Sequence, residues 1–84
     1  MNKIYMVKDL ARTTGHSVNT VKFYIRERLV QEFARSPYTN FRYFDEKSID
    51  RLMKIRDLRR SGTPLKVIKS IFEQDDHASS SLKV

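Results

Sequence analysis

The chain has 84 residues, a net charge of +7 at pH 7 and no cysteine. This length allows one domain with a modest core, and without cysteine the sequence can form neither disulfides nor thiolate metal sites. No apolar stretch approaches the roughly 20 residues of a membrane-spanning helix, and no signal-peptide core follows the first residues. We therefore expect a cytoplasmic protein of one domain.

Positive charge is unevenly distributed along the chain. Residues 1–44 hold eight Lys or Arg and three acidic residues, for a net +5, whereas residues 45–84 hold nine and seven, for a net +2. A polyanionic partner explains this distribution, because contacts with phosphate release counterions and contribute much of the affinity. A solvated basic surface is the alternative.

The first two predicted helices are separated by a tight turn. Residues 6–14 have apolar residues at helical spacing, and Gly15 can end that helix in a left-handed conformation. Ser17 is a good N-cap for a second helix over Val18–Arg28. The apolar side of the second helix, which we expect to be buried, consists of Val18, Val21, Ile25 and Leu29.

The other side of the second helix carries Asn19, Lys22 and Arg26. This layout is typical of a helix-turn-helix whose second helix enters a DNA groove. Phe23 lies beside these polar residues, and the sequence leaves open whether it packs on the next segment or contacts a base or sugar.

The segment from Gln31 to Phe44 changes character and predicts a two-stranded hairpin, or wing. β-forming residues occur at both ends, with Pro37 and Asn40 as turn residues between them. We expect Phe41 and Phe44 to be half-buried strand residues and Arg42 to lie at the root of the hairpin. The predicted tip offers Arg35, Ser36, Tyr38, Thr39 and Asn40 as donors to phosphate oxygens.

Two further helices follow. Asp45 caps a helix over residues 46–61 that Gly62 ends, and Thr63 with Pro64 begins a fourth helix. The predicted fold is therefore mainly α with a small β-hairpin: a winged helix-turn-helix of four helices and a two-stranded wing over residues 1–73. Residues 74–84 are expected to form a polar, disordered tail.

Five motifs in this order resemble the DNA-binding domain of the MerR family, and the resemblance runs from Tyr5 to about Phe72. They are Y-x-V-x-D-L-A-R-x-T-G at Tyr5–Gly15, S-V-x-T-V-K-F-Y at Ser17–Tyr24, F-R-Y-F-D at Phe41–Asp45, I-D-R-L-x-x-I-R-x-L-R-x-x-G at Ile49–Gly62 and L-x-x-I-K at Leu65–Lys69. The resemblance implies that the helix from Ser17 to Arg28 is the recognition helix.

Several positions depart from the family pattern. Lys22 stands where the family usually has arginine, so it keeps the charge but loses the bidentate fork. Phe23 stands at a tyrosine position, and Tyr24 retains the tyrosine that follows. Asn40 and Arg28 replace glycines, and the change at Arg28 bears on the turn into the wing.

The resemblance also implies parts that these 84 residues do not contain. Family regulators of the usual kind continue into a long helix that pairs two subunits and then into an effector-sensing part, and their twisting of an over-long promoter spacer needs two rigidly linked domains. We expect a small natural protein rather than a fragment. We expect this protein to associate on DNA or to form a weak homodimer. No cofactor, metal or small-molecule effector site is predicted.

The main hypothesis is a sequence-specific binder of double-stranded DNA, a MerR-like transcriptional regulator located on the nucleoid. The resemblance implies that Arg42 matches a wing arginine that grips the DNA backbone. The predicted base contacts are Asn19, Lys22, Phe23 and Arg26. The predicted backbone contacts are Arg12, Ser17, Thr20, Tyr24, Arg35, Tyr38, Asn40 and Arg42.

Two alternatives remain open. One is an excisionase-like architectural factor that bends DNA for a recombinase. The other is a protein-interaction module that uses Leu58, Val67, Ile71 and Phe72, which could equally complete the core. An enzyme is not expected, because the sequence has no Gly-rich phosphate loop, no Ser/His/Asp set and no metal-ligand cluster, so no catalytic residue is predicted.

Overall fold

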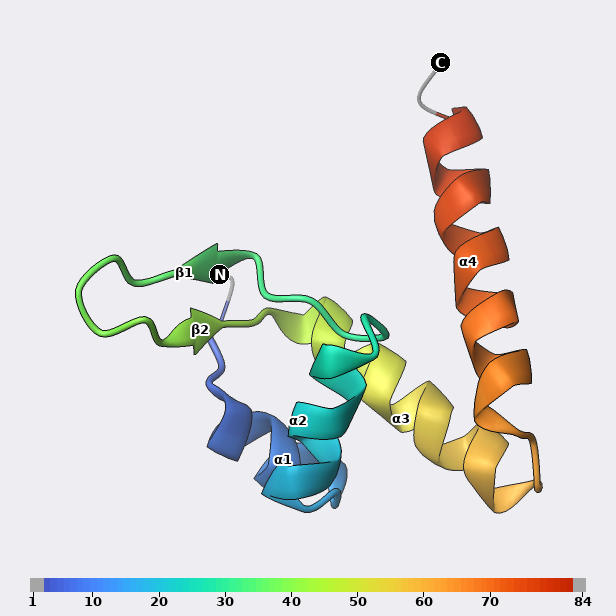
Figure 1. The fold of residues 1–84 in the computed structure, drawn as a ribbon, viewed down its shortest axis with the longest axis horizontal. Coiled ribbons are helices and arrows are strands. Elements are labelled where there is room, and N and C mark those ends of the chain that lie inside the picture. The colour runs from blue at the N-terminus through green and yellow to red at the C-terminus, as the bar shows by residue number, and fades with distance from the viewer. Residues whose placement is uncertain (1–2, 83–84) are drawn as a thin grey trace. The chain divides into compact units, whose positions relative to one another are not determined.

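The computed structural model describes residues 3–82, with side chains for residues 3–74. The described residues form α1 (Val7–Thr14), α2 (Val18–Arg26), β1 (Ala34–Arg35), β2 (Arg42–Tyr43), α3 (Glu46–Arg60) and α4 (Leu65–Leu82) (Figure 1). They divide into two compact units, 1–54 and 55–84, with the boundary inside α3. The predicted winged helix-turn-helix fold, with four helices and a hairpin, is confirmed.

Local capping interactions define α1. The backbone N–H of Met6 donates to Asp9 Oδ2 at 3.0 Å, which satisfies a donor that the first helical turn leaves open. Gly15 has a φ of 79°, and its N–H donates to the carbonyl of Ala11 at 3.0 Å. The glycine therefore ends the helix in the left-handed conformation that the sequence predicts.

The second helix begins at its predicted cap but ends two residues early. Ser17 Oγ accepts the N–H of Thr20 at 3.1 Å, and the last helical residue is Arg26. Arg28 has a φ of 63°, and the N–H of Leu29 donates back to the carbonyl of Tyr24 at 3.0 Å. The left-handed residue turns the chain away from the helix axis, so the helix stops before it.

The buried side of α2 differs from the predicted one. Val21 and Leu29 are buried as expected, and Ile25 is half-buried, but Val18 is 39% exposed. Tyr24, only 6% exposed, belongs to the core instead. The prediction for Val18 was wrong because the buried side of α2 centres between Val21 and Tyr24, which places the first helical residue at its edge.

The wing is an antiparallel hairpin with very short strands. Ala34 pairs with Tyr43, and Arg35 with Arg42. Beyond the strands, the N–H of Ser36 donates to the carbonyl of Phe41 at 2.9 Å. Asn40 takes a φ of 62° in this loop, a conformation that asparagine tolerates better than most residues.

The root of the wing is fastened to the start of the chain. Tyr5 and Phe44 exchange two backbone hydrogen bonds of 2.8 Å. Phe44 is fully buried, more than the half-buried position expected, whereas Phe41 is about half exposed. One end of the hairpin is therefore part of the core, and the other extends into solvent.

The first part of α3 holds the helix-turn-helix in place. Asp45 Oδ1 accepts the N–H of Lys47 at 3.1 Å, which confirms the predicted cap. Arg51 Nε donates to the carbonyl of Leu29 at 2.7 Å, and His16 Nε2 lies 3.0 Å from the carbonyl oxygen of Leu52. The core of this unit consists of Leu10, Ala11, Val21, Tyr24, Leu29, Val30, Phe44 and Leu52.

In the second unit, α3 ends at Arg60 and Gly62 follows with a φ of 87°. The helix α4 begins at Leu65, and the carbonyl of Pro64 accepts the N–H of Ile68 at 3.1 Å. Pro64 therefore directly precedes the helix, which begins where the sequence predicts a start at Thr63 and Pro64.

The structure of α4 concerns two further expectations, the polar tail and the protein-interaction surface. The helix continues to Leu82, beyond the predicted end near residue 73. Side chains from residue 75 onward lie outside the described residues, and the disorder of the tail 74–84 stays a prediction. Of the side chains considered for a protein-interaction surface, Phe72 is buried, Leu58 and Ile71 are half-buried, and Val67 is exposed.

Candidate nucleic-acid interface

The exposed face of α2 presents a row of polar and aromatic side chains. Asn19, Lys22, Phe23 and Arg26 are all exposed. Their spacings of three and four residues place them on adjacent turns of one helical face. This face therefore offers an amide, an ammonium and a guanidinium group to a partner on one side of the helix.

Phe23 has two environments. Its ring packs against Tyr24, with centroids 5.5 Å apart and planes tilted by 57°, and Arg26 Cζ lies 6.0 Å from its centroid. That distance is at the limit of a cation–π contact. Because Phe23 still exposes 36% of its surface, it both packs on a core residue and remains accessible beneath Arg26.

Ser17, Thr20 and Tyr24 have structural roles at this face. Ser17 Oγ donates to Thr20 Oγ1 at 2.8 Å, in addition to capping α2. Tyr24 packs edge-on against His16, with ring centroids 5.7 Å apart. Since Tyr24 is almost fully buried, we assign it to the core rather than to the exposed face.

The wing brings two arginines opposite each other. Arg35 and Arg42 are cross-strand partners, and like charges in that position repel. Arg35 Nη2 donates to Glu32 Oε2 at 3.0 Å, and its Nη1 donates to Asn40 Oδ1 at 3.4 Å. Glu32, which no sequence motif singles out, therefore offsets part of this repulsion.

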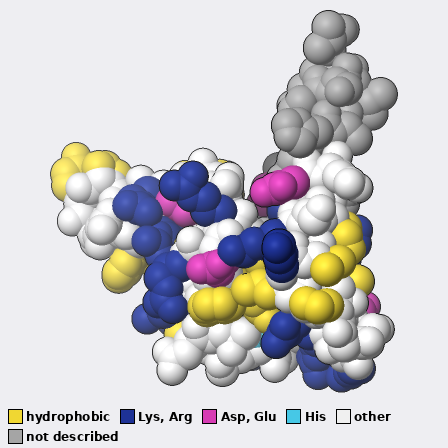
Figure 2. Space-filling view, turned by 45° about the vertical axis from the view of Figure 1, so that its right-hand side comes forward, with side chains coloured by type: hydrophobic (Ala, Val, Ile, Leu, Met, Phe, Trp, Pro, Cys, Tyr) yellow, Lys and Arg dark blue, Asp and Glu magenta, His cyan; other side chains and the backbone are white. Residues whose placement is uncertain are grey.

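An open groove of about 510 Å³ lies between the C-terminal end of α2 and the wing, and we call it the arginine groove. Its lining consists of Ile25, Arg26, Arg28, Val30, Gln31, Glu32, Arg35 and Arg42. Figure 2 shows Lys and Arg side chains gathered at the base of the hairpin, with acidic side chains among them. The lining thus holds four arginines and one carboxylate, a charge balance that favours an anion.

The charge state of the groove follows from Glu32. A hydrogen bond from its own backbone amide lowers the pKa of the Glu32 carboxyl below the ordinary value, and Arg35 and Arg42 act in the same direction against the opposing effect of burial. Glu32 is therefore ionised at neutral pH. The groove retains a formal excess of positive charge, because its arginines outnumber Glu32.

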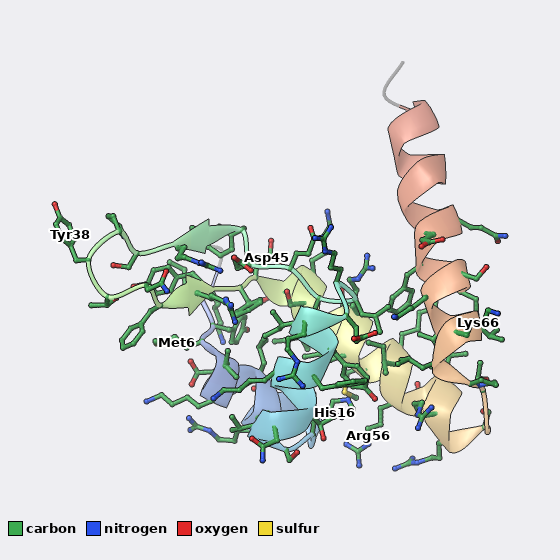
Figure 3. All side chains as sticks on the ribbon, viewed as in Figure 1. Met6, His16, Tyr38, Asp45, Arg56 and Lys66 are labelled. Carbon is green, nitrogen blue, oxygen red and sulfur yellow. The ribbon has the colours of Figure 1, made fainter. Side chains whose placement is uncertain are left out.

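Of the predicted backbone contacts, only Arg35 and Arg42 belong to the groove lining, and the others lie outside it. Tyr38 is 95% exposed at the far end of the hairpin loop (Figure 3). Arg12 is exposed on α1 and forms an ion pair of 3.2 Å with Asp9. Arg28, by contrast, lines the groove, although the sequence pattern marks it only as a glycine replacement. The sequence feature that could have indicated this position is the positive charge of Arg28 shortly before the predicted wing.

Within the part of the chain that is described, no group of three or more His, Cys, Asp or Glu side chains is arranged to hold a metal ion. No helix among these residues is long and apolar enough to cross a membrane.

Comparison with protein families gives a match over most of the chain. The model described as "MerR HTH family regulatory protein" matches residues 5–75. A comparison with curated proteins gave no match.

Solved structures with a similar fold agree with the family match. HiNmlR, a MerR family regulator lacking the sensor domain and bound to promoter DNA, shares 27% identity at a TM-score of 0.80 over 96% of this chain and 61% of its own. PbrR691 from Ralstonia metallidurans CH34, in complex with lead(II), shares 34% identity at a TM-score of 0.79 over 88% of this chain and 57% of its own. A MerR family regulator from Bacillus cereus shares 16% identity at a TM-score of 0.75, covering 83% of this chain and 52% of its own, which shows the fold alone. The chain thus spans about three fifths of the length of the first two proteins.

Proposed function

The chain belongs to the MerR family of helix-turn-helix regulatory proteins, and we propose that it is a transcriptional regulator that binds double-stranded DNA sequence-specifically. The resemblance predicted from its motifs is confirmed. The observation that carries the proposal is the exposed polar face of α2 beside the arginine groove, both within residues 3–54. HiNmlR, which is bound to promoter DNA, supports the same reading.

In this proposal α2 enters the major groove and the wing contacts the backbone. Asn19, Lys22 and Arg26 reach base edges, and Phe23 contacts a thymine methyl group. The backbone contacts are Arg12, Ser17, Thr20, Arg35, Tyr38, Asn40 and Arg42, with Arg28 added from the structure. No catalytic step is part of the proposal. A protein acting in this way works on the nucleoid, in the cytoplasm, and copies associate on DNA.

Selection of bound sites from random duplex DNA tests the proposal. We expect one short sequence to be enriched over successive rounds, with binding that survives competition by unrelated DNA. Inverted half-sites would support a dimeric regulator, and tandem direct repeats would support the architectural alternative. If no sequence is enriched although the protein is folded, sequence-specific binding is wrong.

The assigned roles predict different consequences for two substitutions. Asn19→Ala removes a group that reads a base edge, so the selected sequence changes at one position, at a cost of about 1–3 kcal/mol for the preferred base. Arg42→Ala removes a backbone contact, so affinity falls for all sequences alike. Site selection and competition binding with both variants measure the two effects, and the reverse pattern would contradict the assignment.

A further inference from the structure

Glu32 is the one carboxylate in the lining of the arginine groove. Its Oε2 accepts from Arg35 Nη2 at 3.0 Å, and the side chains of Arg35 and Glu32 are 42% and 26% exposed. Arg35 is also held at its other terminal nitrogen by Asn40 Oδ1, at 3.4 Å. The guanidinium group is therefore already engaged before any ligand arrives, while it stays open enough for a ligand to reach it.

The position of Glu32 has an electrostatic reason. Arg35 and Arg42 lie directly opposite each other in a hairpin whose strands have two residues each, and like charges in such a pair destabilise it. The ionised carboxylate reduces that repulsion in the free protein. A phosphate bound in the groove would supply the same negative charge.

Carboxylate and phosphodiester groups are alternative partners for the same guanidinium fork, because each presents two oxygens to parallel N–H donors. We propose that Glu32 is a built-in competitor of DNA: it holds Arg35 in the free protein and releases it to a backbone phosphate on binding, which lowers the affinity for every sequence alike. This inference rests on the proposed function and adds a residue that sets affinity without contacting a base.

The substitution Glu32→Gln tests the competition. Glutamine keeps the size of the side chain and an oxygen that can accept from Arg35, so the wing retains its local hydrogen bond. Affinity for a random-sequence duplex should rise about two- to fivefold, the magnitude expected from a partly exposed ion pair. Fluorescence anisotropy at several salt concentrations should also show a steeper salt dependence, because the neutral glutamine side chain takes up no cation when the phosphate displaces it.

A matched control separates competition from a general charge effect. Asp50→Asn removes the same unit of charge from an exposed position of α3 in the same compact unit, outside the groove lining. We expect this variant to bind nearly as the unchanged protein does. Equal gains in the two variants would overturn the proposal, and so would weaker binding by Glu32→Gln, which would make Glu32 a positioning residue for Arg35.

A second measurement follows the carboxyl group itself. The pKa of Glu32, read by NMR titration of its side-chain carbon, should be higher in the DNA complex than in the free protein, because Arg35 leaves it and a phosphate approaches. By linkage, the affinity for DNA should then strengthen as the pH falls through the pKa values of Glu32 in the complex and in the free protein. A pKa that is unchanged or lower in the complex would overturn the proposal.

The binding measurements also distinguish a failure of this inference from a failure of the proposed function. If the unchanged protein fails to bind duplex DNA at low salt, the proposed function is wrong and the inference falls with it. If the protein binds DNA but Glu32→Gln brings no gain, only the inference is wrong.

Discussion

Arg28 combines an unfavourable backbone conformation with a positive charge in the lining of the arginine groove. Its φ of 63° lies in the left-handed region, which costs a residue with a Cβ roughly 1–2 kcal/mol. The neighbouring hydrogen bond from Leu29 to Tyr24 requires this conformation. The guanidinium group of Arg28 lies in the lining of the arginine groove.

Replacing Arg28 by glycine should therefore stabilise the protein and weaken DNA binding. We expect a gain of about 0.5–1 kcal/mol in the free energy of unfolding, since glycine relieves the strain but loses more backbone entropy on folding. Urea denaturation measures the gain. Arg28→Ala is the control, because alanine keeps the strain and also lacks the charge, and a gain of the same size with alanine would refute the strain argument.

At the scale of the element, α2 depends on its surroundings. A helix of nine residues is too short to be stable alone in water. It is held by the Ser17 cap at one end, by the left-handed turn at Arg28 at the other, and by the burial of Val21 and Tyr24 between them. These fixed ends orient the exposed face that we propose to read DNA.

Loss of the cap should destabilise this helix. Ser17→Ala removes the acceptor for the N–H of Thr20 and should lower the free energy of unfolding by about 1 kcal/mol. Ser17→Asp restores an acceptor and places a negative charge at the helix N-terminus, so stability should return. Thermal denaturation compares the two variants, and equal losses would show that the cap is not the cause.

The same pair of variants separates stability from binding. A carboxylate at position 17 repels a DNA phosphate, so Ser17→Asp should bind DNA more weakly than Ser17→Ala although it is more stable. Tighter binding by the aspartate variant would exclude a phosphate contact at this residue.

At the scale of the whole molecule, the positive charge is concentrated where the proposed interface lies. Residues 1–44 carry a net +5 of the total +7, and they include α2 and the hairpin. Positive charge far from the interface would do little at physiological salt, since screening acts over about 8 Å. The concentration of positive charge in residues 1–44, which include α2 and the hairpin, therefore favours phosphate contacts.

This distribution predicts steep salt dependence for DNA binding. With roughly four to six phosphates neutralised by Lys or Arg, affinity should fall about 10²–10³-fold between 50 and 200 mM monovalent salt. Anisotropy titrations across that range give the slope directly. Tight binding that is indifferent to salt would exclude an interface dominated by backbone phosphates.

The sequence by itself determined the features that depend on near neighbours. The caps at Ser17 and Asp45 and the helix end at Gly15 were predicted because capping uses residues within one turn. The order of helices and wing followed from these signals, and the exposed face of α2 from its helical spacing.

Only the tertiary structure decided which of these residues meet. The pairing of Arg35 with Arg42 depends on strand register, and the burial of Tyr24 on what packs around α2. Arg28 and Glu32 enter the candidate site only because the chain turns sharply after α2 and brings them beside the wing. These residues are close in sequence, but strand register and the conformation of the turn decide whether they meet, and packing of the whole unit sets both.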